Sequence, residues 1–211
     1  LSYEYKNDIG TMNKIINKDL NEVINYINFN LKHKPIIIVG MMAAGKSAIG
    51  RMLAKSLNRN FFDIDQNIED RYHIKIYEIF EKYGEEKFRD IEHEEIKKID
   101  LKSNNIISTG GGAFTFKRNY SILNKIGLTI WLNTNQKTII KRLKKNINNR
   151  PLLKDVDLET YVGSLLIKRS LLYSKANLTV ISNNYSKIEM RNKVLLEIKK
   201  YLVENNNVKN Y

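Results

Sequence analysis

The chain has 211 residues, 42% of them hydrophobic, and no cysteine, which excludes disulfide frameworks and thiolate metal sites. Its formal net charge of +13 at pH 7 suits an anionic ligand, ATP and nucleic acid alike. No apolar run approaches the ~20 residues that span a bilayer, and no signal-peptide pattern is seen, so we expect one cytoplasmic domain without a membrane partner.

A helix is predicted ahead of the first strand. Apolar residues recur there every three or four positions, at Ile16, Leu20, Val23, Ile27 and Leu31. This spacing is typical of one face of an amphipathic helix. Because Pro35 ends the segment, we assign residues 1–34 to an N-terminal extension.

From Pro35 onward, short apolar strands alternate with helical patterns. Strands are expected over residues 36–39, 60–65, 105–108, 128–132 and 177–181. Helices are expected over residues 46–57, 76–83, 85–99, around 121, 138–145, 158–175 and up to about 203. This alternation predicts an α/β fold of three layers, in which helices cover both faces of a parallel sheet. One domain would span residues 35–204, followed by a flexible polar tail at 205–211.

The stretch Gly40–Ser47, "GMMAAGKS", matches G-x-x-x-x-G-K-S between the first strand and the next helix. In such a loop the backbone N–H groups face phosphate oxygens, and the helix N-terminus adds partial positive charge. Lys46 would reach the β- and γ-phosphates of a nucleotide, and the Ser47 hydroxyl would bind Mg²⁺. The alternative is an ordinary glycine turn, but such a turn would not require a strand directly before it and a helix directly after it.

Two acids follow in "NFFDIDQ". Asp63 and Asp65 are two positions apart on a segment expected to be extended, so their side chains would point the same way. They lie at the carboxyl end of a strand, where open parallel sheets bind ligands. One carboxylate would hold Mg²⁺, and the other would orient or deprotonate an acceptor hydroxyl.

A third element is the glycine run in "IISTGGGAF". Gly110, Gly111 and Gly112 bring bare backbone against a ligand, or else form a flexible turn. No N-K-x-D motif for guanine follows, which argues against a GTPase. The basic stretch 133–154 has no acid and no interleaved aromatic residue. An RNA-binding surface would need such aromatics, so RNA binding remains a remote alternative, and we expect no nucleic-acid partner.

Taken together, these motifs resemble those of the shikimate kinases over about residues 36–182. The matching runs appear in the family's order: "GMMAAGKS", "FFDID", "EIF…GEEKFRDIE", "STGGG", "RPLL" and "KRSLLYSKA". The resemblance implies a nucleoside-monophosphate-kinase-like P-loop fold with a five-stranded parallel sheet and a mobile lid at about 146–157. It also implies Mg²⁺-dependent transfer of the γ-phosphoryl group of ATP to the 3-hydroxyl of shikimate, by a monomer whose partners are ATP and shikimate.

The resemblance assigns roles position by position. The expected catalytic residues are Lys46, Asp65 and Arg150, and the expected Mg²⁺ ligands are Ser47 and Asp63. The expected ATP-binding residues are Gly40, Met41, Met42, Ala43, Ala44, Gly45, Lys46, Ser47, Ala48, Arg142 and Arg150. The expected substrate-binding residues are Asp65, Arg89, Gly110, Gly111, Gly112 and Arg169. A pair of guanidinium groups suits the substrate carboxylate, and Glu92 would orient Arg89 from the same helical face.

Four positions depart from the family pattern. Ala43 stands where a further glycine is usual, and Ala48 replaces a frequent second hydroxyl. His73 and Lys75 replace a usual glycine and a small hydroxyl residue. None of these changes removes a catalytic group. Gluconate kinase or another small-molecule P-loop kinase is the nearest alternative, although the two arginines and the glycine run argue against it.

Overall fold

The computed structural model describes residues 19–100, 104–145, 147, 153–183 and 185–207. Arg150 and half of the expected lid at 146–157 lie outside these residues. Among the described residues, no helix is both long enough and apolar enough to span a membrane.

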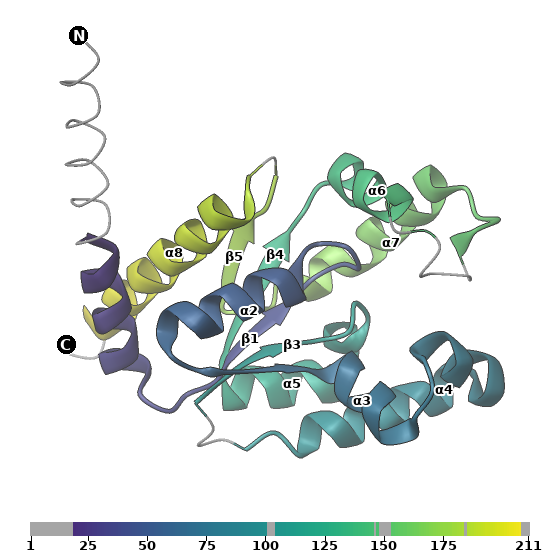
Figure 1. The fold of residues 1–211 in the computed structure, drawn as a ribbon, viewed down its shortest axis with the longest axis horizontal. Coiled ribbons are helices and arrows are strands. Elements are labelled where there is room, and N and C mark those ends of the chain that lie inside the picture. The colour runs from purple at the N-terminus through teal and green to yellow at the C-terminus, as the bar shows by residue number, and fades with distance from the viewer. Residues whose placement is uncertain (1–18, 101–103, 146, 148–152, 184, 208–211) are drawn as a thin grey trace, which may run out of the picture.

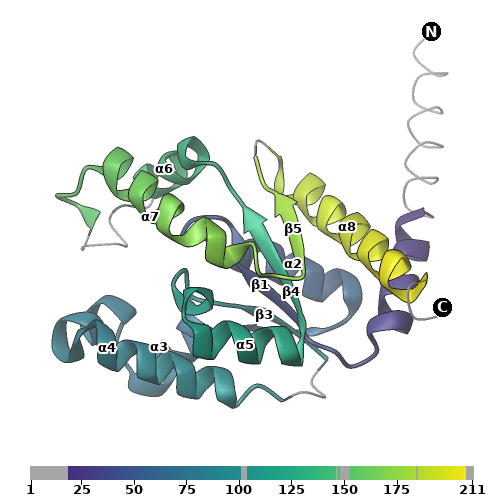
Figure 2. The same ribbon diagram turned by 180° about the vertical axis from the view of Figure 1, so that it is seen from behind.

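The strands form one parallel sheet in the order β2-β3-β1-β4-β5, which Figure 1 shows from one side and Figure 2 from the other. They are β1 (Ile36–Val39), β2 (Asn60–Asp63), β3 (Asn105–Ser108), β4 (Leu128–Asn133) and β5 (Leu178–Ile181). In the register, Ile36 of the central strand pairs with Ile106 of β3 and with Leu128 of β4. The predicted α/β architecture with a five-stranded parallel sheet is confirmed.

The described helices connect these strands. They are an unlabelled helix over residues 19–31, α2 (Lys46–Leu57), α3 (Ile64–Tyr72), α4 (Ile76–Lys97), α5 (Lys117–Ile126), α6 (Gln136–Lys145), α7 (Leu158–Tyr173) and α8 (Lys187–Asn207). A 3₁₀ turn at Ala113–Thr115 precedes α5. The last helix therefore continues past the predicted end near Val203 and includes three residues that were assigned to a flexible tail.

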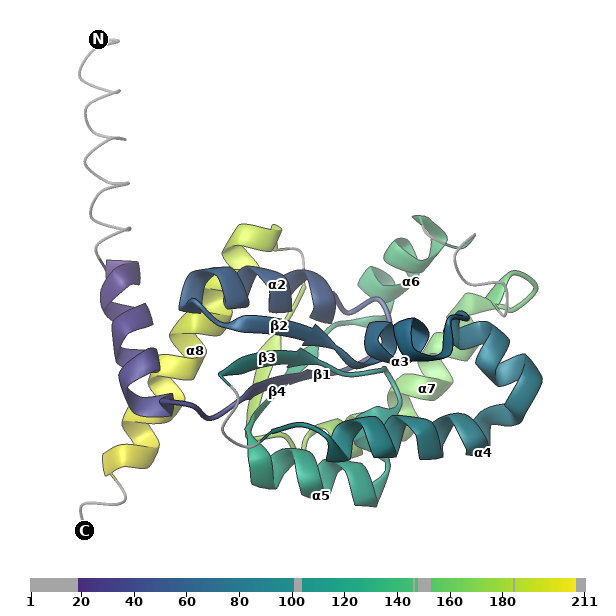
Figure 3. The ribbon, with the colours of Figure 1, turned by 60° about the horizontal axis from the view of Figure 1, so that its bottom comes forward.

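The central strand divides the core into two clusters, because successive side chains of a strand point to opposite faces. Ile36 and Ile38 pack with the 19–31 helix, α2 and α8. Ile37 and Val39 pack with α3, α4, α5, α6 and α7. Figure 3 shows α2 on one face of the sheet and α5 on the other, with the 19–31 helix beyond one end of the strands beside α8. The result is the predicted three-layer arrangement.

The 19–31 helix lies against α8 and is part of one of these clusters (Figure 3). Its Val23 and Ile27 are buried. Behind it, the buried Arg59 donates hydrogen bonds to the carbonyl oxygens of Lys34 at 2.8 Å and Lys32 at 3.1 Å. Burial lowers the pKa of Arg59 to about 10. The described part of the extension, residues 19–34, is thus packed into the same body as the sheet.

One predicted local structure is wrong. The segment after β2 is not extended through Asp65, because α3 begins at Ile64. Asp63 is the N-cap of this helix and accepts a hydrogen bond from the Gln66 backbone N–H at 3.4 Å. Asp65 therefore lies in the first helical turn and does not continue the strand.

The end of α3 explains one departure from the family pattern. His73 is the C-cap and has φ 57°, ψ 23°, a left-handed conformation that glycine adopts without cost. We expect His73→Gly to stabilise the fold by about 0.5–1 kcal/mol, because a side chain in this region costs about 1–2 kcal/mol while glycine loses more chain entropy. The midpoint of urea unfolding measures this gain.

Ser174→Gly is the matched control. Ser174 is the C-cap of α7 with right-handed φ −64° and ψ −9°, so glycine relieves no strain there. This variant should be slightly less stable than the parent chain. If the midpoint of urea unfolding changed equally in the two variants, the backbone strain assigned to His73 would be contradicted.

Candidate active site

A cleft of about 1630 Å³ lies at the carboxyl ends of the strands. It is lined by most of the predicted site residues, namely Met42, Ala43, Ala44, Gly45, Lys46, Ser47, Ala48, Asp63, Asp65, Arg89, Gly110, Gly111, Gly112, Arg142 and Arg169. Gly40 and Met41 are not among the lining residues, and Met41 is buried in the core. The cleft therefore joins the phosphate-type loop and the expected acceptor residues in one space.

The loop after β1 is shaped by three residues with positive φ. These are Gly40 at 136°, Ala43 at 57° and Gly45 at 99°. A Cβ at Gly40 would lie 2.8 Å from the carbonyl oxygen of Leu132 in β4, so only glycine fits there. Ala43 adopts the left-handed region with a side chain, which is the strain that the usual glycine avoids.

Two basic side chains close around this loop. Lys46 is buried, and its Nζ donates to the carbonyl oxygen of Met41 at 2.9 Å. Arg142 of α6 lies across the loop, and its Nη1 donates to the carbonyl oxygens of Ala43 at 3.1 Å and Ala44 at 2.8 Å. Both cations lie at the N-terminal end of α2, where the helix dipole already favours a negative ligand.

Ser47 and Asp63 bring two oxygen ligands together. The Ser47 hydroxyl donates to Asp63 Oδ2 at 2.5 Å and lies 3.2 Å from the Ser108 hydroxyl. A hydroxyl and a carboxylate suit Mg²⁺, which takes only one or two protein ligands and completes its shell with water and phosphate oxygens. No group of three or more His, Cys, Asp or Glu side chains that could hold a metal ion occurs in the described part of the chain. The pair fits a nucleotide-bound Mg²⁺ and not a metal held by protein alone.

On the acceptor side, two carboxyl groups converge on Gly110. A Cβ at Gly110 would lie 2.7 Å from Asp65 Oδ1 and 2.6 Å from Glu92 Oε1. Both oxygens are buried without a hydrogen-bond partner among the described residues. Burial, with Asp63 nearby, raises the pKa of Asp65 to about 6. Burial raises the pKa of Glu92 to about 7, although Arg89 acts in the opposite direction.

Arg89 lies beside this pair in a pocket of aromatic rings. Its guanidinium carbon is 5.8, 5.1 and 5.2 Å from the ring centres of Phe80, Phe88 and Phe116, so ring faces surround the cation. A Cβ at Gly112 would lie 2.6 Å from Arg89 Nη2. The third glycine of the run therefore makes room for the guanidinium group.

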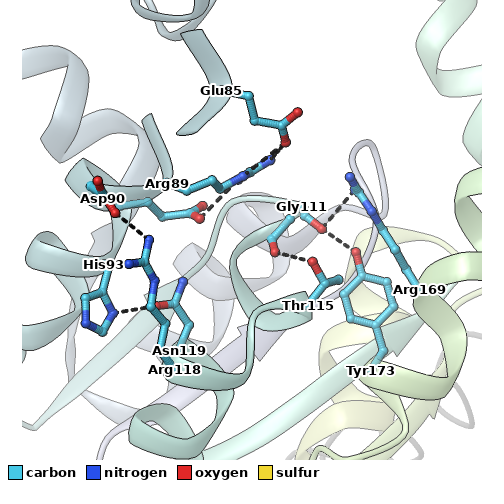
Figure 4. Close-up of polar contacts among 12 residues, drawn as sticks. Glu85, Arg89, Asp90, His93, Gly111, Thr115, Arg118, Asn119, Arg169 and Tyr173 are labelled. Atoms are coloured by element: carbon cyan, nitrogen blue, oxygen red, sulfur yellow. Dashed lines mark hydrogen bonds and ion pairs between the residues drawn. The ribbon is translucent and has the colours of Figure 1, made fainter. Parts of the chain in front are cut away.

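Gly111, the middle glycine of the run, contacts both Arg169 and the loop after β1. The carbonyl oxygen of Gly111 accepts hydrogen bonds from Arg169 Nη1 at 3.2 Å and from the Tyr173 hydroxyl, and Figure 4 shows both side chains directed at it. A Cβ at Gly111 would lie 3.0 Å from the backbone nitrogen of Met42. The glycine run thus packs between the nucleotide loop and the acceptor residues.

Sequence reasoning missed several residues of the cleft. Tyr173 had no signal of its own, because its partner Gly111 lies 62 positions away in the chain. Ser182, Tyr185 and Lys187 also line the cleft. They follow the carboxyl end of β5, and the rule that ligands bind at that edge would have found them.

Tyr173→Phe should weaken binding of the acceptor. Tyr173 is buried, and burial raises the pKa of its hydroxyl to about 12. Loss of the Tyr173 hydroxyl leaves the Gly111 carbonyl oxygen with the Arg169 hydrogen bond alone, so the glycine run and Arg169 are held less firmly. We expect the KM for the phosphoryl acceptor to rise about three- to tenfold, since one such bond contributes about 1 kcal/mol. Steady-state kinetics with each substrate varied in turn measures this.

Tyr201→Phe, a change on α8 outside the cleft, is the control and should leave both KM values unaltered. An equal rise in the two KM values for Tyr173→Phe would indicate a general loss of structure.

Residues 42–200 match the family described as shikimate kinase. The chain belongs to the shikimate kinase family. It is 38% identical over 164 residues to the shikimate kinase of Thermodesulfovibrio yellowstonii, covering 78% of this chain and 94% of that one. The family resemblance seen in the sequence is therefore confirmed, and with it the assignment as an ATP-dependent shikimate kinase.

Solved structures agree with this assignment. The fold is similar to that of a shikimate kinase from Acinetobacter baumannii in complex with shikimate, with a TM-score of 0.75, 34% identity and coverage of 79% of this chain and 93% of the other. A gluconokinase from Sinorhizobium meliloti 1021 gives a TM-score of 0.53 at 14% identity, covering 85% of this chain and 98% of its own. That likeness concerns the fold alone.

Proposed function

We propose that this shikimate kinase transfers the γ-phosphoryl group of ATP to the 3-hydroxyl of shikimate with Lys46, Asp65 and Arg150 as its catalytic residues. The observation that carries the proposal is the position of the glycine run. Gly111 packs on the loop that would hold ATP, while Gly110 and Gly112 make room for Asp65 and Arg89. Donor and acceptor would thereby meet across one short turn.

In the nucleotide half, the loop N–H groups and Lys46 would hold the phosphates, and Arg142 would lie beside them. Ser47 and Asp63 would hold Mg²⁺, which neutralises charge on the β- and γ-phosphate oxygens when it is bound. Arg150, which lies outside the described residues, is proposed to reach the transferred group. An arginine there would stabilise charge that spreads as the phosphoryl group moves.

In the acceptor half, Arg89 and Arg169 would bind the shikimate carboxylate, with Gly110 to Gly112 giving backbone contacts. Asp65 would accept the proton of the 3-hydroxyl while the new O–P bond forms and the bond from the γ-phosphorus to the bridging oxygen of ADP breaks. Its raised pKa of about 6 leaves it mostly ionised at pH 7, so it can serve as the base. The proton therefore goes from the substrate oxygen to the Asp65 carboxylate.

A coupled assay of ADP release tests the activity. Shikimate, gluconate and nucleoside monophosphates are offered separately with MgATP, and we expect only shikimate to stimulate turnover. ATP consumption that responds to gluconate and not to shikimate would favour the alternative kinase. Omission of Mg²⁺ in the presence of a chelator should abolish turnover.

A further inference from the structure

Arg89 already has carboxylate partners on its own helix. Its Nε and Nη2 donate to Glu85 Oε1 at 3.3 and 3.0 Å, and its Nη1 donates to Glu92 Oε2 at 3.0 Å. The Nε and Nη2 groups form one of the two edges on which a guanidinium binds a carboxylate in bidentate fashion. Glu85 therefore occupies an edge that a substrate carboxylate would use, as Figure 4 shows.

The two acidic partners differ in burial. The Glu92 side chain is fully buried, whereas the Glu85 side chain is 64% exposed. A buried partner is held in place by its surroundings, but an exposed ion pair contributes little and exchanges readily with solvent or another anion. Glu92 is thus the permanent partner of Arg89, and Glu85 is the replaceable one.

The backbone at Glu85 is consistent with its role as the replaceable partner of Arg89. The preceding residue, Gly84, has φ 77° and ψ 169° and interrupts α4. Glu85 therefore begins the second helical part and is not held by an unbroken helix on its N-terminal side. Its side chain also lines the cleft, so it can turn away into solvent without disturbing the core.

From this geometry we infer that Glu85 acts as a built-in competitor of the substrate carboxylate. With the cleft empty it neutralises and orients Arg89, and it leaves the Nε/Nη2 edge when the substrate binds. The inference rests on the proposed function, because it takes Arg89 as a residue that binds the shikimate carboxylate. Glu85 would then weaken binding of every carboxylate ligand while keeping the guanidinium group in its aromatic pocket.

The alternative is that Glu85 only positions Arg89, and the two roles predict opposite signs. A competitor weakens substrate binding, so its neutralisation should strengthen it. A positioning residue improves substrate binding, so the same change should weaken it. Glu85→Gln keeps the size of the side chain and removes its charge, and the exposed position makes loss of folding no concern.

The experiment measures shikimate binding by calorimetry in the absence of ATP, and then the KM for each substrate. For Glu85→Gln we expect the Kd and KM for shikimate to fall about two- to fivefold, the range that an exposed ion pair can supply. The KM for ATP should stay as it is, and kcat should change less than the KM for shikimate. Glu86→Gln, which removes a neighbouring exposed charge, should match the parent chain.

Unaltered or weaker shikimate binding by Glu85→Gln would overturn the inference, and so would an equal gain from Glu86→Gln. These outcomes are distinct from failure of the proposed function. In that case the parent chain itself would neither bind shikimate nor release ADP in its presence.

Discussion

Asp65→Asn is expected to lower kcat about a thousandfold while leaving the affinity for ATP nearly unaltered. The amide keeps the size and position of the carboxyl group but cannot accept the proton of the acceptor hydroxyl, and a general base contributes about 10²–10⁴-fold to a rate. Asp65 lies beside Gly110 and Glu92, on the acceptor side of the cleft. Nucleotide titration by fluorescence, together with kcat from the ADP assay, measures both effects.

Asp70→Asn is the matched control, because Asp70 lies on the same helix and bonds only to the exposed Gln66 amide among the described residues. It should retain parental kcat. If Asp65→Asn lost ATP binding, or kept more than about a tenth of kcat, the carboxylate would not be the proton acceptor.

Gly112→Ala is expected to lower kcat/KM for shikimate at least about a hundredfold. The added Cβ would lie 2.6 Å from Nη2 and 2.8 Å from the central carbon of the Arg89 guanidinium group. Because aromatic rings surround this group, it has little room to move, and displacement of a substrate-binding group by about 1 Å costs about 10²-fold. Kinetics with varied shikimate at saturating ATP measures the loss.

Gly163→Ala makes the same chemical change on α7. There the nearest atom would be the end of the flexible Gln136 side chain, at 3.2 Å, so this variant should behave as the parent. The KM for ATP should also stay constant in Gly112→Ala. A matching rise in that KM would mean that alanine disturbs the whole glycine run.

Local patterns in the sequence predicted much of the fold. The bounds of α2, Lys46–Leu57, agree with the prediction, because the glycine–lysine–serine pattern marks its start. The short apolar runs predicted the strands, because a parallel sheet that is covered on both faces buries its strands almost completely. Most of the site residues that the family motifs assign line the cleft, although the Arg150 assignment stays a prediction.

The start of α3 was predictable but was misread. Asp63 followed three positions later by Gln66 is a helix N-cap signal, and it outweighs the apolar alternation that predicts a strand through Asp65. The contacts of Glu85 and Tyr173 are different. The contact of Glu85 with Arg89 depends on a kink at Gly84. The contact of Tyr173 with Gly111 joins segments 62 positions apart. A single sequence reveals neither contact.

The packed residues 19–34 lie outside the region that the family model matches. The family model matches this chain from residue 42, yet the buried Arg59 donates its hydrogen bonds to the carbonyl oxygens of Lys32 and Lys34. A chain shortened to the similar region would leave this cation without its acceptors and would bare the side of α8 that Val23 and Ile27 cover. The packing that holds α8 and Arg59 in place therefore begins before the first residue that the family model matches.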